Sequence, residues 1–178
     1  MILGLDVSTS ITGITLLDNE GEVVYNTSVD TRKYKNFFEK ADKIETELKY
    51  LWRATKIDLL PKRIFIEQSL QSFRSGFSSA KTLSTLARFN GVVSWIIYKN
   101  WGVEPEYIAA TSARKKAGIT VPKGVKGKDA VIKYVIDNVP DVLIEYTKHN
   151  NPKPHCFDKA DSWVIARAGW VICQNKEK

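Results

Sequence analysis

The order of the apolar segments constrains the fold of this chain more than any other feature. Three apolar stretches, 1–7, 11–17 and 21–29, follow one another through connections of only a few residues. Such short connections join antiparallel neighbours, so the segments predict a three-stranded meander. Apolar residues at spacings of three and four then predict a helix over 36–56. The apolar run at 63–67 predicts a fourth strand, which a helical crossover would place parallel to the first.

The rest of the chain continues to alternate between helices and strands. The pattern predicts, in order, helix 78–100, strand 107–110, helix 112–117, helix 128–138 and helix 158–173. This order predicts an α/β fold in which a mixed five-stranded sheet is flanked by helices. The length of 178 residues suits one domain that spans 1–178.

The composition bears on the cellular compartment and on the kind of binding partner. No apolar run is long enough to span a bilayer. Two cysteines, Cys156 and Cys173, are too few for a disulfide scaffold or a cysteine zinc site, so we expect a cytoplasmic protein. The net charge of +7 is unevenly distributed, because residues 68–133 hold 11 Lys or Arg against three acids and the remainder holds 16 basic and 17 acidic residues. A basic excess gathered in one region favours a nucleic acid as the partner.

Four acidic residues stand where a charge is unfavourable. Asp6 interrupts the first apolar strand, Glu67 ends the fourth, and Asp158 and Asp161 share one face at the first turn of the last helix. Buried carboxylates repel one another, but they are tolerated where they hold divalent cations, and ligands that are all carboxylate oxygens suit Mg²⁺ or Mn²⁺. Each acid also has a structural alternative: a backbone hydrogen bond for Asp6, an ion pair for Glu67, and an N-cap or first-turn position for the other two.

The same acids lie within three motifs, GLDVSTSITG at 4–13, IEQ at 66–68 and DKADS at 158–162. In order and approximate spacing these resemble the catalytic motifs of the RuvC-type Holliday junction resolvases, members of the RNase H-like superfamily, and the similarity extends over nearly the whole chain. The resemblance implies an RNase H-like fold and a crossover junction endodeoxyribonuclease that leaves 5′-phosphate and 3′-hydroxyl ends. It further implies that two Mg²⁺ ions, for which Mn²⁺ would substitute, are held around the scissile phosphate by Asp6, Glu67, Asp158 and Asp161.

Basic residues lie on both sides of a predicted loop around Pro122. The resembled family carries catalytic lysines in two places here, and Lys115 and Lys128 are the nearest matches. Four neighbouring basic residues would bind the DNA backbone: Arg114, Lys116, Lys123 and Lys126. For each lysine the alternative is a phosphate contact that adds affinity without affecting the rate.

The segment 68–77 is predicted to be a loop. In the resembled family an aromatic residue at this place stacks on bases unpaired at the junction centre, and Phe73 with Arg74 is the predicted pair. Leu70 is an alternative for the inserted residue, and packing of Phe73 into the core is another. His155 is either a proton carrier at the site or a histidine of a surface loop.

The implied substrate also predicts the oligomeric state. A four-way junction has two-fold symmetry and needs two opposed nicks, so we expect a homodimer. The interface would lie on the early turns of helix 78–100, where small side chains gather: Ser79, Ala80, Ser84 and Ala87.

Three other functions share part of this sequence pattern. An actin-like or sugar-kinase ATPase shares the pattern of the first motif but needs two such domains, well over about 300 residues. Retention of all four acids argues against a non-catalytic module that only binds DNA. An RNase H-like nuclease acting on RNA–DNA hybrids or on other branched DNA is not distinguished by the sequence.

Overall fold

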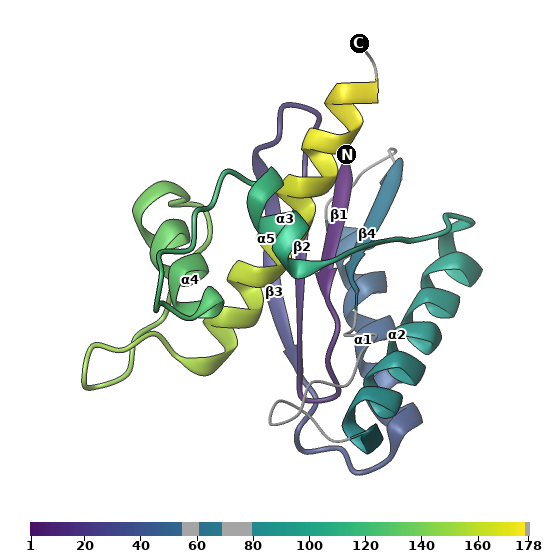
Figure 1. Ribbon diagram of the computed structural model, residues 1–178. Helices are drawn as coiled ribbons and strands as arrows, with labels where there is room; N and C mark the ends of the chain where they lie inside the picture. Colours follow the sequence, from purple (N-terminus) through teal and green to yellow (C-terminus); the bar gives the residue numbers. More distant parts are fainter. Residues whose placement is uncertain (55–60, 69–79, 177–178) are drawn as a thin grey trace.

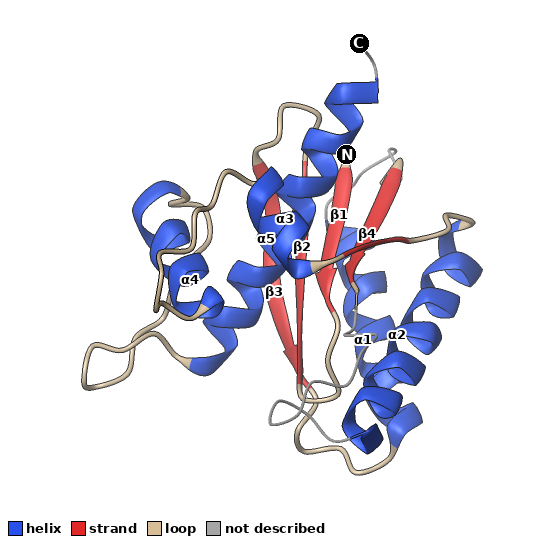
Figure 2. Cartoon of the chain, viewed as in Figure 1, coloured by secondary structure: helices blue, strands red, loops and turns tan. Residues whose placement is uncertain are grey.

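The computed structural model describes residues 1–54, 61–68 and 80–176, and its centre is a mixed sheet of five strands (Figures 1 and 2). The strands stand in the order β3-β2-β1-β4-β5 and are β1 (Ile2–Asp6), β2 (Ile11–Leu17), β3 (Val23–Asp30), β4 (Arg63–Glu67) and β5 (Glu106–Ile108). The predicted meander is confirmed, because β1, β2 and β3 pair antiparallel. The predicted parallel pairing of the fourth strand with the first is confirmed as well.

Helices cover both faces of the sheet. One face carries α1 (Phe37–Ala54) and α2 (Ala80–Trp101), and the other carries α3 (Ala110–Lys116), α4 (Gly127–Asn138) and α5 (Pro154–Lys176) (Figure 1). Alternate residues of β1 feed the two cores: Leu3 and Leu5 pack with α1 and α2, whereas Ile2 packs with the helices of the other face. The predicted α/β fold with a mixed five-stranded sheet is therefore confirmed.

The last helix lies directly on the sheet. Gly4 of β1 and Gly13 of β2 make this possible, because a Cβ at Gly4 would be 2.3 Å from the Ala166 nitrogen and one at Gly13 would be 1.9 Å from the Asp158 carbonyl oxygen. Both distances are far below any tolerated contact, so the two glycines set how closely α5 approaches. In the described residues, no helix has the length and apolar character needed to cross a membrane.

Two boundaries differ from the prediction in ways that affect the site. The last helix begins at Pro154, about one turn before the predicted start at 158, because proline suits the first helical position. Asp158 is therefore not an N-cap, and Asp158 and Asp161 lie beyond the first turn. The fifth strand ends at Ile108 and the next helix begins at Ala110, so that strand is shorter than predicted.

Candidate active site

Two of the four acids stand side by side at the carboxyl ends of neighbouring strands. Asp6 is the last residue of β1 and Glu67 the last of β4. The register pairs Leu5 with Ile66, so the two carboxylates follow each other directly across a parallel pair whose strands are about 4.8 Å apart. Parallel strands present their carboxyl ends at one edge of a sheet, and this edge gathers the polar groups of the site.

The other two acids reach the same edge from α5. Gly13, the partner of Asp6 across β1 and β2, faces the backbone of Asp158. Asp161 lies one turn further along the helix, and its side chain is buried. The structure thus brings together the four acids that the sequence singled out.

Burial raises the pKa values of all four carboxylates, and the charges of neighbouring carboxylates raise those of Asp6, Glu67 and Asp158 further. Burial raises the pKa of Asp6 well above its ordinary range, and the charges of Glu67, Asp161 and Asp158 raise it further. Burial and the charge of Asp161 raise the pKa of Glu67 to about 7. Burial likewise raises the pKa of Asp158, to about 6, and that of Asp161. Such a concentration of disfavoured negative charge favours binding of a cation at this edge.

Lys128 supplies a positive charge to this cluster. Its Nζ lies 3.3 Å from Asp161 Oδ2 and 4.0 Å from Asp158 Oδ1. Burial lowers the pKa of Lys128, but attraction to Asp161, Asp6 and Asp158 outweighs burial and raises the pKa overall. Of the two lysines predicted to be catalytic, Lys128 is the one placed against the carboxylates.

Arg114 is a second basic residue at the cluster. Its guanidinium lies beside Gly127, where a Cβ would be 2.7 Å from Arg114 Nη1, and its charge lowers the pKa of both Glu67 and Asp161. Lys115 follows Arg114 on α3 and points about 100° away around the helix, where it is exposed. The three other lysines predicted to contact DNA are also exposed: Lys116, Lys123 and Lys126.

The residues predicted to insert into the junction and the predicted proton carrier do not join this cluster within the described residues. Phe73, Arg74 and Leu70 lie outside the described residues. His155 is in the first turn of α5 and not in a loop, and its Nε2 is 3.0 Å from Glu145 Oε1.

A buried polar network beside the acids was missed by sequence reasoning. Thr15 Oγ1 and Ser162 Oγ share a hydrogen bond of 2.7 Å, which joins β2 to α5. The amide of Asn26 donates to Thr15 Oγ1 at 2.7 Å and to the Lys159 carbonyl oxygen at 3.1 Å. These bonds attach α5 to the sheet next to Asp161. The available signal was Thr15 within the mostly apolar strand β2, whereas Asn26 of β3 stands in a run of consecutive polar residues that does not single it out.

The chemistry of the donors fits a hard divalent cation, since all four candidate ligands are carboxylates. In the described part of the chain, however, no three acidic, histidine or cysteine side chains converge closely enough to enclose an ion. The ammonium of Lys128 lies against the two carboxylates of α5 instead. Binding of a cation there would replace this ion pair.

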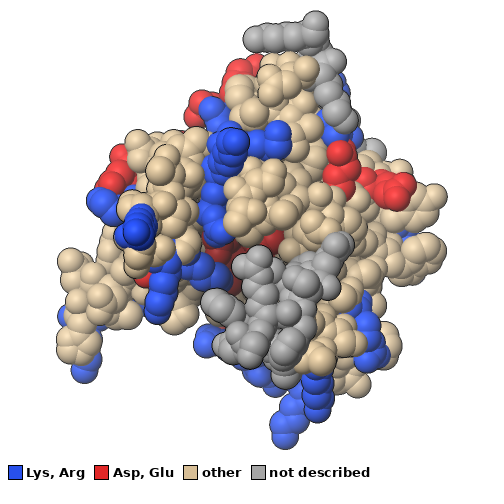
Figure 3. Space-filling view, in the orientation of Figure 1, with Lys and Arg blue, Asp and Glu red and all other residues tan. Residues whose placement is uncertain are grey.

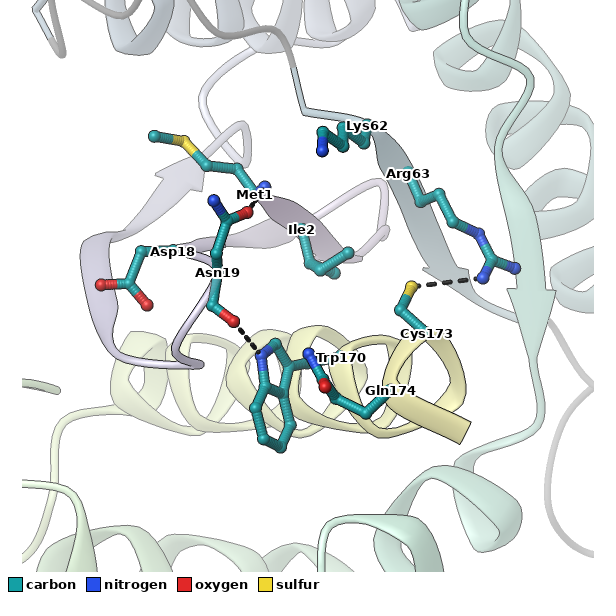
Figure 4. Close-up of a pocket in the computed structure, with 9 residues that line it drawn as sticks. All are labelled: Met1, Ile2, Asp18, Asn19, Lys62, Arg63, Trp170, Cys173 and Gln174. Carbon is teal, nitrogen blue, oxygen red and sulfur yellow. Dashed lines mark hydrogen bonds between the residues drawn. The ribbon is translucent and has the colours of Figure 1, made fainter. Parts of the chain in front are cut away.

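The surface around the site separates the two signs of charge. Figure 3 shows acidic atoms at the bottom of a recess, with Lys and Arg side chains beside it over α3 and α4. A separate pocket lies at the opposite end of the sheet and is lined by residues at the start of β1 and β4, including Ile2, Arg63 and, on α5, Cys173 (Figure 4). The length of β1, about 13 Å, separates that pocket from Asp6.

No protein-family model matches the sequence, and no curated protein matches it. Solved structures do match the fold. Thermus thermophilus RuvC in complex with a Holliday junction substrate superimposes with a TM-score of 0.68 at 15% identity, covering 98% of this chain and 95% of that one. The chain has the RuvC fold. The yeast mitochondrial Holliday junction resolvase Ydc2 shares it, with a TM-score of 0.60 at 15% identity, covering 98% of this chain and 79% of that one.

Proposed function

We propose that this protein is a metal-dependent endonuclease that resolves four-way (Holliday) DNA junctions by paired nicks. One observation carries the proposal: four carboxylates with raised pKa values, one buried and three half-buried, meet at one edge of a sheet that has the RuvC fold. The two solved proteins compared above are a RuvC bound to a Holliday junction substrate and a Holliday junction resolvase. The basic excess of residues 68–133 supports a DNA substrate.

Two Mg²⁺ ions would be held by the carboxylates of Asp6, Glu67, Asp158 and Asp161. When bound, the ions would lower the pKa of a water molecule and stabilise the leaving 3′-oxygen in an in-line displacement. Such a hydrolysis leaves 5′-phosphate and 3′-hydroxyl ends.

The basic residues at the cluster would act on the phosphate. Lys128 is paired with the acids of α5, and binding of cations would free its ammonium to face a phosphate oxygen. Arg114, already close to Glu67 and Asp161, would hold the same phosphate from the α3 side. Lys115 remains a predicted catalytic residue, and the exposed lysines of the 116–126 region would contact the DNA backbone.

Two nicks placed symmetrically require two active sites, so we propose a homodimer that pairs through the outer face of α2. This face exposes Trp95 and Tyr98, at 62% and 51%, and has open space beside Gly91. An antiparallel pair of α2 helices centred on Gly91 would place Trp95 opposite Ala87 of the partner subunit and Tyr98 opposite Ser84 of the partner subunit. Large side chains would then meet small ones, as a self-complementary two-fold interface requires.

Sedimentation tests the dimer directly. We expect a dimer at micromolar concentration for the natural chain and a monomer for Trp95→Lys, which places a charge at the interface. A natural chain that sediments as a monomer would contradict this part of the proposal.

A cleavage assay with Mg²⁺ tests the nuclease. The substrates are a synthetic four-way junction, a Y-fork, a linear duplex and an RNA–DNA hybrid, and we expect paired nicks in the junction above all. Asp6→Asn should abolish cleavage and leave junction binding intact, because it removes one ligand and no basic contact. Efficient cleavage by Asp6→Asn, or preference for the hybrid, would overturn the assignment.

A further inference from the structure

Residues 31–38, which comprise the connection from β3 to α1 and the first two residues of α1, lie at the same edge of the sheet as the carboxylates. On β2, Gly13 pairs with Asp6 of β1, and Ile11 pairs with Asp30 of β3. One strand therefore separates the strands of Asp6 and Asp30, and Asp30 lies two residues further along, so the two residues are about 12 Å apart at ordinary strand spacing. In Figure 1 this segment forms the loop at the bottom of the view, below the carboxyl end of β1.

The segment is fixed to the turn that follows Asp6. The Thr31 backbone nitrogen donates to the Ser10 carbonyl oxygen at 2.8 Å, and Thr31 Oγ1 donates to the Thr9 carbonyl oxygen at 3.0 Å. Lys40 Nζ, in the first turns of α1, donates to the same Thr9 oxygen at 2.5 Å. A ligand bound here would meet a surface that is already ordered, which lowers the entropic cost of binding.

Two lysines of the segment carry charges that no ion pair among the described residues neutralises. Arg32 is bound to Asp30 at 2.5 Å, and its hydrogen bonds lower the pKa of that carboxyl to about 2. Lys33 and Lys35 are exposed, and within the described residues neither has an ion-pair partner. Lys33 lies 5.1 Å from the centre of the Tyr34 ring. Both lysines lie outside the basic region 68–133. Figure 3 shows basic side chains projecting at the bottom of the same face.

An exposed aromatic ring follows these lysines closely in the sequence. Phe38 is 66% exposed, at the start of α1. Its inner neighbour Phe37 supports it edge-on with ring centres 5.6 Å apart, and Phe37 itself packs on buried Phe89 at 5.0 Å. Free lysines beside a supported, exposed aromatic ring are the combination with which proteins bind single-stranded nucleic acid.

We propose that residues 31–38 bind unpaired nucleotides of the cleaved DNA strand where it leaves the carboxylate edge. Lys33 and Lys35 contact successive phosphates, and Phe38 stacks on an unpaired base. This inference rests on the proposed function insofar as the ligand is the strand being cut. It adds a second set of DNA contacts, on the β3 side of the carboxylates, to the basic residues of α3 and α4 on the other side.

Fluorescence anisotropy in a chelating buffer tests the segment without cleavage. The probes are a Y-fork with single-stranded arms and a blunt duplex of the same length, each titrated at several salt concentrations. The double variant Lys33→Ala/Lys35→Ala should lower the salt slope for the fork by about 1.4, about 0.7 for each lysine. Phe38→Ala should weaken binding to the fork at least about fivefold and binding to the duplex less than twofold.

Matched controls keep the result specific. Lys62→Ala removes one lysine charge at the opposite end of the sheet, beside Met1 in Figure 4, and so controls for the share of each lysine in the double variant. Tyr50→Ala removes an exposed ring from the same helix, about 18 Å from Phe38 along the axis. If the test variants match these controls, or if Phe38→Ala affects both probes equally, the segment does not bind unpaired DNA.

The result of the anisotropy experiment can be distinguished from the result of the nuclease assay. If the natural chain binds the fork but does not cut a junction in Mg²⁺, the nuclease proposal fails and the anisotropy still decides on the segment. If the natural chain binds neither probe, both proposals are overturned. Melting temperatures of all variants show whether any loss reflects unfolding.

Discussion

Glu67→Gln should stabilise the metal-free protein at alkaline pH, although it removes a residue proposed to be essential. Burial and the charge of Asp161 raise the pKa of Glu67 from its ordinary value of 4.5 to about 7. Above pH 7 the folded protein therefore holds this carboxylate ionised at a cost of about 3 kcal/mol relative to the unfolded chain. Glutamine has the same shape and no charge, so this cost disappears.

The sign of the effect fixes its pH dependence. Below pH 4.5 Glu67 is protonated in both the folded and the unfolded state, so glutamine brings no electrostatic gain. Between pH 4.5 and pH 7 the unfolded chain loses the proton first, and the natural protein loses stability relative to the variant as the pH rises. At pH 8 the full gain of about 3 kcal/mol should raise the melting temperature by about 6–12 °C for a chain of this length.

Thermal denaturation in a chelating buffer at pH 4 and pH 8 measures the effect. The value at pH 4 records any change in packing, and the difference between the two pH values isolates the charge. Glu104→Gln, at an exposed position, is the control and should show no such difference. Addition of Mg²⁺ should narrow the difference at pH 8, because the natural protein gains about 2.7 kcal/mol at a concentration 100 times its Kd and the variant gains less. A stability difference that is the same at pH 4 and pH 8 would refute the reasoning.

Two further substitutions test how the site is held. Gly13→Ala would place a Cβ 1.9 Å from the Asp158 carbonyl oxygen, so α5 must shift, and we expect a loss of about 1–3 kcal/mol in chemical denaturation and a larger loss of cleavage than of DNA binding. Lys128→Ala removes the ammonium paired with Asp158 and Asp161, so the metal-free protein should melt at a lower temperature at pH 8 than the natural chain, and junction cleavage should fall as well. Lys128→Arg should restore the melting temperature, and its failure to do so would show that packing, not charge, is responsible.

The sequence predicted the sheet because local signals agreed with the final fold. Short connections between 1–7, 11–17 and 21–29 left antiparallel pairing as the simplest arrangement, and the run at 63–67 followed a helix of crossover length. The start of α5 was wrong by about one turn. The residues from Asn150 to Pro154 are of types that interrupt helices, but a proline is well tolerated at the first position of a helix, so α5 begins at Pro154.

The four acids could be predicted because each stood against its surroundings in the sequence, as Asp6 does within an apolar strand. The basic residues could not be ranked in the same way. Arg114, Lys115 and Lys116 are consecutive basic residues that the sequence does not distinguish. The direction in which each side chain leaves helix α3 decides that Arg114 faces the carboxylates. The lysines at 33 and 35 went unnoticed because a net charge over a long window cancels a short basic segment against acids elsewhere. The segment matters because it lies close to Asp6 across β2, and a charge count along the sequence does not show this closeness.

The carboxylates of the site repel one another, but the contacts that hold α5 on the sheet do not involve these carboxylates. The close approach of α5 to Gly4 and Gly13 and the bond between Thr15 and Ser162 involve no carboxylate. Protonation of the acids, or exchange of Lys128 for a cation, therefore changes side-chain interactions while the helix stays attached to the sheet. Because the carboxylates contribute repulsion to folding, their positions have to be maintained by contacts of this independent kind. The two glycines and the buried hydroxyl pair should for this reason matter to cleavage, although none of them would contact the DNA.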